Sequence, residues 1–126
     1  MEATHQDRAY SPESIISTGS VQIVRRYTGR GPTRARTAIT DDLVTILMRD
    51  TLTTGERNLV EAGAHERVLE LRATYQQVMR DELVALVESQ IDRKVEAFMS
   101  NNHTDPDVAV EIFVLAQRPA KAELHS

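Results

Sequence analysis

Cysteine and tryptophan are absent from this sequence, and aromatic residues are scarce, with two Phe and three Tyr in 126 residues. Without cysteine, the chain cannot form disulfides or bind a metal through thiolates. With so few rings, the core has to be aliphatic, and stacking platforms for the bases of single-stranded nucleic acid are nearly missing. Disulfide-stapled folds and thiolate metal sites are therefore excluded.

Long hydrophobic runs are also missing. No apolar run approaches the roughly 20 residues that a membrane-spanning helix needs. Residues 1–10 are polar and lack the apolar segment of a secretory signal. The formal net charge of −4 argues against a dedicated nucleic-acid binder, so no nucleic-acid partner is expected. We expect a cytoplasmic protein.

Length and composition are those of one globular domain. Hydrophobic residues make up 40% of the chain and charged residues 27%, so wholesale disorder is not expected. A chain of this length buries about two-thirds of its extended surface, which is enough for one core. We predict a single domain over residues 11–117, with flexible tails at 1–10 and 118–126.

A first helix is predicted from the Ser-Pro-Glu sequence at 11–13, since Ser caps a helix, Pro suits its first position and Glu favours its positive end. Gly19 lies in the apolar stripe, where its missing side chain permits close packing. The glycines and proline of 29–32 end the helix. The stripe consists of Ile16, Ser20, Ile23 or Val24, and Tyr27.

Two extended runs, 34–39 and 43–49, flank a turn with two acids at 40–42 and predict a β-hairpin. Thr53 and Glu56 then have the spacing of a capping box. This spacing predicts a short helix that breaks at Gly63.

A long helix is predicted over residues 65–91, which would span about 40 Å and cross a small sheet. Its polar residues, Gln76 among them, are expected on the outward side. The inward stripe is predicted to contain Val68, Leu71, Tyr75, Val78 or Met79, Leu83, Leu86 or Val87, and Gln90 or Ile91.

Two further strands, 95–100 and 108–117, are predicted around a turn at 105–107. The order of elements is then helix, hairpin, two helices, hairpin, or αββααββ. Short strands joined by tight turns form antiparallel pairs. We therefore predict an α+β fold, a two-layer sandwich in which the long helix crosses a four-stranded antiparallel sheet.

The last predicted strand is apolar on both sides, and such a strand needs cover on both faces of its sheet. The first helix or a second copy of the chain could supply the second cover, and we predict a homodimer. One side of the strand carries Val108, Val110, Ile112 and Val114, and the other carries Ala109, Glu111, Phe113 and Leu115.

Five arginines fall between positions 25 and 36 with no acid among them. Guanidinium groups beside the backbone N–H groups of a glycine turn suit phosphate, carboxylate, bicarbonate or a nucleic-acid backbone. The alternative is that these arginines pair with some of the 19 acids on the surface. The candidate anion-binding residues are Arg30, Arg34, Arg36, Gly29 and Gly31.

A second candidate is a functional loop at 101–105 that contains His103 and Asp105. His and Asp two residues apart could hold a divalent metal or orient a proton shuttle. A zinc site needs three or four ligands, and the other three histidines are not spaced to complete one. The alternative is an Asx-type turn with a solvent-facing His. We expect no bound metal and no cofactor.

Signals of catalysis are absent from the sequence. There is no G-x-S-x-G elbow, and no Ser is placed recognisably against a His and an acid. The paired acids at 41–42 and at 105 and 107 lie in predicted turns, and adjacent turn residues cannot face each other across a substrate-sized cleft. We therefore expect no catalytic residues and no enzyme.

Residues 27–32, 41–46 and 52–57, followed by the long helix and by 103–105, together resemble the MpsC family of small bacterial proteins. The resemblance covers roughly 12–117. The G-x-G-P turn, the acid-turn hairpin and the L-T-x-x-E helix start are each weak alone but fairly specific in this order. His103 with Asp105 matches the family's hairpin motif. Gly55 departs from the family's pattern at the helix start, where Pro or a similar residue is usual.

The family is named for a sodium-translocating, membrane-potential-generating system. The resemblance implies a soluble accessory protein linked to a membrane cation or bicarbonate uptake complex, and it supplies no catalytic residues. Our leading hypothesis is a non-enzymatic regulatory or assembly module that contacts another protein, such as a membrane complex. The alternatives are a small-anion sensor and a weak nucleic-acid binder, both using the arginines.

Overall fold

The structure of the protein is a computed structural model, and it describes residues 11–117. Both predicted tails, 1–10 and 118–126, lie outside the described residues. The order of elements confirms the predicted αββααββ arrangement. The elements are α2 (Pro12–Thr28), β1 (Arg34–Thr40), β2 (Leu43–Arg49), α3 (Thr54–Glu61), α4 (His65–Ile91), β3 (Val95–Thr104) and β4 (Asp107–Leu115).

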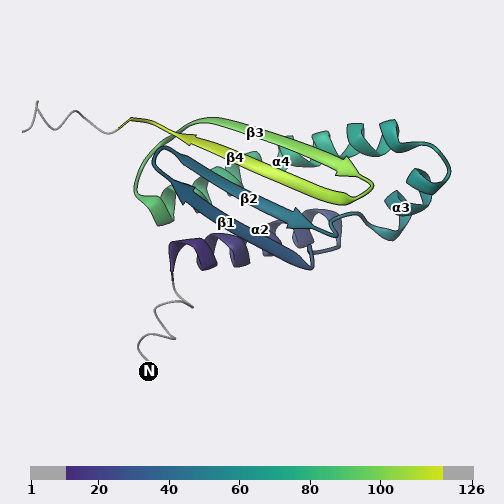
Figure 1. Cartoon of the computed structure of the whole chain (residues 1–126), viewed down its shortest axis with the longest axis horizontal. Helices are drawn as coiled ribbons and strands as arrows, with labels where there is room; N and C mark the ends of the chain where they lie inside the picture. Colours follow the sequence, from purple (N-terminus) through teal and green to yellow (C-terminus); the bar gives the residue numbers. More distant parts are fainter. Residues whose placement is uncertain (1–10, 118–126) are drawn as a thin grey trace, which may run out of the picture.

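The four strands form one antiparallel sheet in the order β1-β2-β4-β3. The hairpins β1–β2 and β3–β4 therefore meet along β2 and β4, the two central strands. Figure 1 shows α2 and α4 behind the sheet, with α3 beyond the end of the strands. The predicted two-layer α+β fold is confirmed.

The first helix packs with its predicted stripe inward. Ser11 caps it, and the Ser11 Oγ accepts a hydrogen bond from the Ser14 N–H at 3.1 Å. A Cβ on Gly19 would lie 2.8 Å from Leu86 Cδ2, so the glycine lets α2 approach α4 closely. Ile16, Ser20, Ile23 and Val24 are buried.

The short helix α3 begins with the predicted capping box. The Thr53 N–H donates to Glu56 Oε1 at 2.8 Å, and the Glu56 N–H donates to Thr53 Oγ1 at 3.2 Å. Gly63, with φ of +86°, reverses the chain between α3 and α4. Local cap and turn chemistry thus determines both ends of this segment.

The long helix α4 has the predicted bounds, but its inward stripe is partly wrong. Leu71 and Val78 are 42% and 57% exposed, whereas Arg72 and Gln76 are 3% and 5% exposed. The buried row is Val68, Arg72, Gln76, Met79, Leu83 and Val87. This row also repeats at three and four residues, and its two polar members find polar partners in the core, which lowers the cost of their burial.

The second hairpin differs from its prediction in length. Residues 101–104, expected in a loop, belong to β3 and pair with β4 up to Thr104 and Asp107. The last strand ends at Leu115 and not at residue 117. The polar Asn and His residues at the end of β3 have weak strand propensity, so the sequence pattern did not indicate a strand there. In the structure, pairing with β4 outweighs that weak propensity.

The two sides of β4 are divided as predicted. Ala109, Glu111, Phe113 and Leu115 are buried beneath the helices, and the four alternating valine and isoleucine residues of β4 face the other way. Ile16, Ile23 and Val24 of α2 belong to the same core cluster as Phe113 and Leu115. The first helix therefore covers the same face as α4, and no helix of the described residues lies on the other face of the sheet.

Candidate functional site

The side of the sheet turned away from the helices is the largest candidate surface. Residues directly opposite one another on neighbouring strands share a face, so the strand register defines this surface. We call it the open face. Its members are Arg34, Arg36, Ala38 and Thr40 of β1, Leu43, Thr45, Leu47 and Arg49 of β2, Val108, Val110, Ile112 and Val114 of β4, and Ala97, Met99, Asn101 and His103 of β3.

The middle of the open face is apolar. Leu43 is 41% exposed and Met99 50% exposed, and Val110 and Ile112 lie between them half-buried. No helix or strand of residues 11–117 covers these side chains. A contiguous apolar surface of this kind is typical of a contact site.

One end of the open face is basic. Arg34 is directly opposite Arg49 in the β1–β2 register, and Arg36 lies one row further in, opposite Leu47. Within residues 11–117 none of the three arginines forms an ion pair. Like charges directly opposite each other on a sheet are destabilising. The three arginines and Leu47 line an open hollow of about 470 Å³.

The predicted anion-binding residues are only partly brought together. Arg34 and Arg36 share the hollow, but the Arg30 guanidinium contacts Asp50 Oδ2 at 2.6 Å. Gly29 has φ of +84°, and its N–H donates to the Arg25 carbonyl at 2.8 Å, so this N–H closes the helix. A Cβ on Gly31 would lie 2.9 Å from Arg25 Nε, so this glycine makes room for the Arg25 side chain.

Arg49 is the residue of the basic end that the sequence analysis missed. A two-residue turn at Asp41 and Asp42 places Thr40 opposite Leu43, and counting back along both strands then places Arg34 opposite Arg49. The hairpin prediction therefore contained the signal for this pair. The register, and not the glycine turn, gathers the arginines.

The two residues of the predicted functional loop, His103 and Asp105, lie at the end of the β3–β4 hairpin. His103 lies on the exposed end of β3, with Nδ1 2.9 Å from the Pro106 carbonyl oxygen, and Asp105 is exposed in the turn. Within the part of the chain that the structure describes, no group of three His, Cys, Asp or Glu residues could hold a metal ion.

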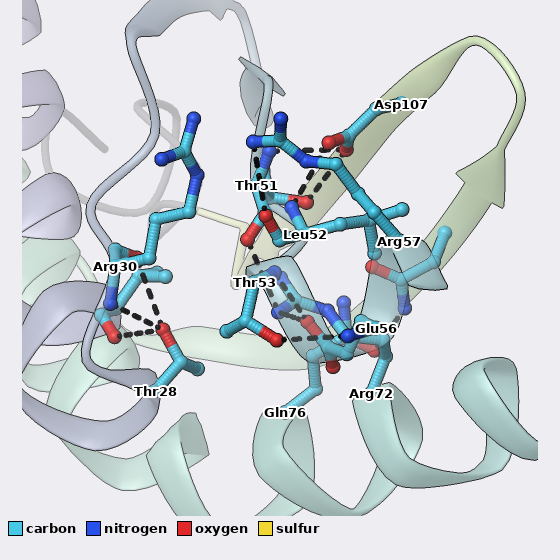
Figure 2. Close-up of polar contacts among 12 residues, drawn as sticks. Thr28, Arg30, Thr51, Leu52, Thr53, Glu56, Arg57, Arg72, Gln76 and Asp107 are labelled. Atoms are coloured by element: carbon cyan, nitrogen blue, oxygen red, sulfur yellow. Dashed lines mark hydrogen bonds and ion pairs between the residues drawn. The ribbon is translucent and has the colours of Figure 1, made fainter. Parts of the chain in front are cut away.

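Asp107 joins this hairpin to Thr51 and Leu52, which precede α3. Its Oδ1 accepts from the Thr51 N–H at 3.0 Å and the Thr51 hydroxyl at 2.9 Å, and its Oδ2 accepts from the Leu52 N–H at 2.9 Å. Figure 2 shows this carboxylate beside the segment that leads into α3. Asp107 ties the β3–β4 hairpin to that segment.

Beneath this contact lies a buried ion pair. Arg72 Nη1 is 3.3 Å from Glu56 Oε1, and the two side chains are 3% and 4% exposed. Arg72 Nη1 also donates to the Thr51 carbonyl at 3.4 Å. Figure 2 shows that Arg72 reaches from α4 to the start of α3. The acid of the L-T-x-x-E motif is therefore both a cap and the buried partner of a cation.

A second buried carboxylate, Glu111, lies in the centre of the covered side of the sheet. It accepts hydrogen bonds from the Ser100 hydroxyl and from Gln76 Nε2, the latter at 3.3 Å. Asn102 Nδ2 donates to Gln76 Oε1 at 2.9 Å and extends the network. Burial raises the pKa of Glu111 to about 7, although these hydrogen bonds and the charge of Arg72 oppose the rise.

These polar groups bind mainly to one another. Glu56 forms an ion pair with Arg72 and caps its own helix. Asp107 accepts hydrogen bonds from the backbone of the segment before α3. The open cleft beside them, about 330 Å³, is lined by Asp50 and Arg57, which form an ion pair at 2.9 Å. The Thr51 and Ser100 hydroxyls in turn donate to Asp107 and Glu111.

Comparison with known proteins identifies the family of the chain. No curated protein and no solved structure is significantly similar to the chain. Among the described residues, no helix is long and apolar enough to cross a membrane. A family model described as "Na+-translocating membrane potential-generating system (MpsC)" matches residues 10–117. The match spans nearly the whole chain, including every described helix and strand, and the chain therefore belongs to the MpsC family.

Proposed function

We propose that this chain is a non-enzymatic accessory or regulatory protein of the membrane system named in the family description. It acts by binding protein surfaces and not by converting a substrate. The observation that carries the proposal is the open face, an apolar sheet surface that no described element covers. The use of the buried acids in caps and ion pairs supports the non-enzymatic role.

The proposed location is the cytoplasm, at the periphery of a membrane complex that takes up cations or bicarbonate. Self-association into a homodimer is part of the same proposal. A protein with this role changes the sodium-dependent membrane potential of its host without any chemical turnover of its own.

The test is complementation of a strain that lacks the chain, with the sodium-dependent membrane potential measured by a voltage-sensitive dye. We expect the wild-type chain to restore the potential. Val110→Glu places a charge in the middle of the open face and should fail to restore it. Val78→Glu, the same exchange at a 57% exposed site on α4, is the control and should restore it. An unchanged potential in the deletion strain would refute the proposal.

A second candidate function is the sensing of a small anion. The observation that favours it is the hollow lined by Arg34, Arg36 and Arg49, whose charges have no acid partner among residues 11–117. Guanidinium groups in such a cluster bind phosphate or carboxylate oxygens through paired N–H donors.

Titration calorimetry with bicarbonate, phosphate and a nucleotide tests this candidate. We expect heat of binding that disappears in Arg49→Gln and persists in Arg67→Gln, an exposed arginine of α4. No heat from any of the three anions would eliminate it. Weak binding of a nucleic-acid backbone by the same arginines would instead weaken steeply with salt, because counterions are released.

A further inference from the structure

The open face is positively charged at one end and has acidic residues at the other. The three arginines occupy the end where β1 begins, and the β1–β2 turn at Asp41 and Asp42 occupies the other. Asp42 pairs with Arg93 at 2.6 Å, whereas the exposed carboxylate of Asp41 forms no ion pair within residues 11–117. The apolar side chains lie between these ends. A surface with this distribution is complementary to itself when one copy is turned end over end.

We propose that a second copy of this chain covers the open face, in a two-fold dimer whose axis lies between the two sheets and runs perpendicular to the strands. This operation places β1 over β1 and β2 over β2, with strand directions reversed. The open face has four rows across the strands, of which the first contains Arg34 and Arg49 and the fourth contains Thr40 and Leu43. First-row residues of one copy then lie over fourth-row residues of the other, and second-row residues lie over third-row residues.

The rows fit together in size under this operation. In the second and third rows, Leu47 of one copy lies over Thr45 of the second copy, and Arg36 over Ala38. Val110 lies over Ile112. Large side chains therefore face small or aliphatic ones, the arrangement that lets the layers of a β-sandwich interdigitate about 10 Å apart.

The ends become ion pairs between copies. Arg34 of one copy lies over Thr40 of the second copy, one residue from its Asp41, and Arg49 lies beside Arg34 at the same end, over Leu43. Asp42 stays paired with Arg93 of its own copy. Sheets in sandwiches cross at about 30°, which displaces a row about 10 Å from the axis by about 5 Å. The length of an arginine side chain spans that displacement. Each dimer contains the contact twice, because a two-fold interface repeats it.

Other arrangements leave the charges unmatched. An axis parallel to the strands would bring the two arginine ends together with no acid between them. A different protein would need its own acids and apolar surface in the same spacing, which nothing in this chain specifies. The second copy carries both already.

The area agrees with a reversible dimer. Four strands about 4.8 Å apart and about 23 Å long give a flat footprint of roughly 440 Å² per copy. Two copies bury about twice that, at or below the small end of stable interfaces. We therefore expect a dimer that dissociates on dilution.

Light scattering after size exclusion, at several loading concentrations, measures the assembly. The molar mass of the wild-type chain should rise from 14.1 kDa towards twice that value with concentration. Val110→Glu should stay at the monomer mass, while Val78→Glu, on the exposed side of α4, should behave as wild type. Circular dichroism melts of both variants confirm that each is folded.

A charge exchange tests the axis itself. Arg34→Asp and Asp41→Arg should each weaken the dimer at least about tenfold, since each leaves like charges or an unpaired charge at both ends. The double variant restores opposite charges across the two-fold axis and should recover most of the wild-type affinity. Position 41 has φ of +50°, so Asp41→Arg could lower stability. In that case the dimer affinity of Arg49→Asp alone tests the same end of the open face.

A monomer at every concentration would overturn the dimer. A dimer that Val110→Glu leaves intact would overturn the choice of face, and failure of the double variant to recover would overturn the axis. This dimer deepens the self-association that belongs to the proposed function and rests on it. The accessory role itself is decided separately, by the membrane potential of the deletion strain. A wild-type monomer that still restores the potential would point to another protein on the open face.

Discussion

Two carboxylates are buried, Glu56 at the start of α3 and Glu111 on the covered side of the sheet, and they are stabilised differently. Glu56 faces the guanidinium of Arg72 and remains paired. Glu111 is met mainly by neutral donors, Ser100 and Gln76, and burial raises its pKa to about 7. A carboxyl whose pKa is higher in the folded chain than in the unfolded chain stabilises the fold when protonated.

At the residue scale, the stability of the fold should depend on pH through Glu111. The unfolded value is 4.5, so the stability contributed by the protonated acid is complete below that pH and is lost as pH rises through about 7. The loss amounts to about 3 kcal/mol. Glu111→Gln should be more stable than wild type at pH 8 and similar at pH 4.5 in urea unfolding. The exposed Glu96→Gln is the control, and an equal pH response in all three chains would contradict this.

The pair formed by Arg72 and Glu56 gives a second prediction. Arg72→Met removes the partner of a buried acid and should lower the free energy of unfolding by about 3 kcal/mol. Adding Glu56→Gln removes the orphaned charge and should recover much of the loss, since a neutral pair carries no desolvated ion. Denaturant unfolding of the single and double variants measures the coupling. Additive losses would show that the two side chains act independently.

At the element scale, the inward side of α4 decides which apolar residues matter. Leu83→Ala removes a fully buried side chain and should destabilise the protein by about 3 kcal/mol. Leu71→Ala is the matched exchange at a 42% exposed position and should cost under about 1 kcal/mol. Thermal or urea unfolding compares the two. Similar losses would mean that Leu71 is packed.

The β3–β4 hairpin offers another matched pair of acids. Asp107→Ala removes hydrogen bonds to two backbone N–H groups and a hydroxyl, and should cost about 2 kcal/mol. Asp105→Ala changes an exposed turn acid and should have little effect. Hydrogen exchange at Thr51 and Leu52 reports the contact directly. Protection that persists at both amides in Asp107→Ala would contradict the assignment.

At the scale of the whole molecule, association couples to stability. A dimer is stabilised by mass action, so its melting temperature rises with concentration. We expect the melting temperature of the wild-type chain to rise by a few degrees over about a hundredfold range of concentration. Val110→Glu should melt at one temperature throughout. A wild-type melting temperature that is independent of concentration would contradict self-association.

The sequence by itself determined the elements and their order. Caps at Ser11 and Thr53, the acid turn at 40–42 and the glycines that end α2 and α3 act over a few residues, and each formed as predicted. The alternation in β4 also fixed which of its residues share a face. The order of local motifs was enough to indicate the MpsC family.

The tertiary structure decided which faces meet. The stripe of α4 could not be chosen from periodicity alone, because Arg72 and Gln76 become favourable core residues only once Glu56 and Glu111 lie opposite them. The placement of α2 beside α4 likewise left the other side of the sheet without cover from residues 11–117. Burial of a polar group and exposure of an apolar face depend on partners distant in the chain, and no local pattern contains them.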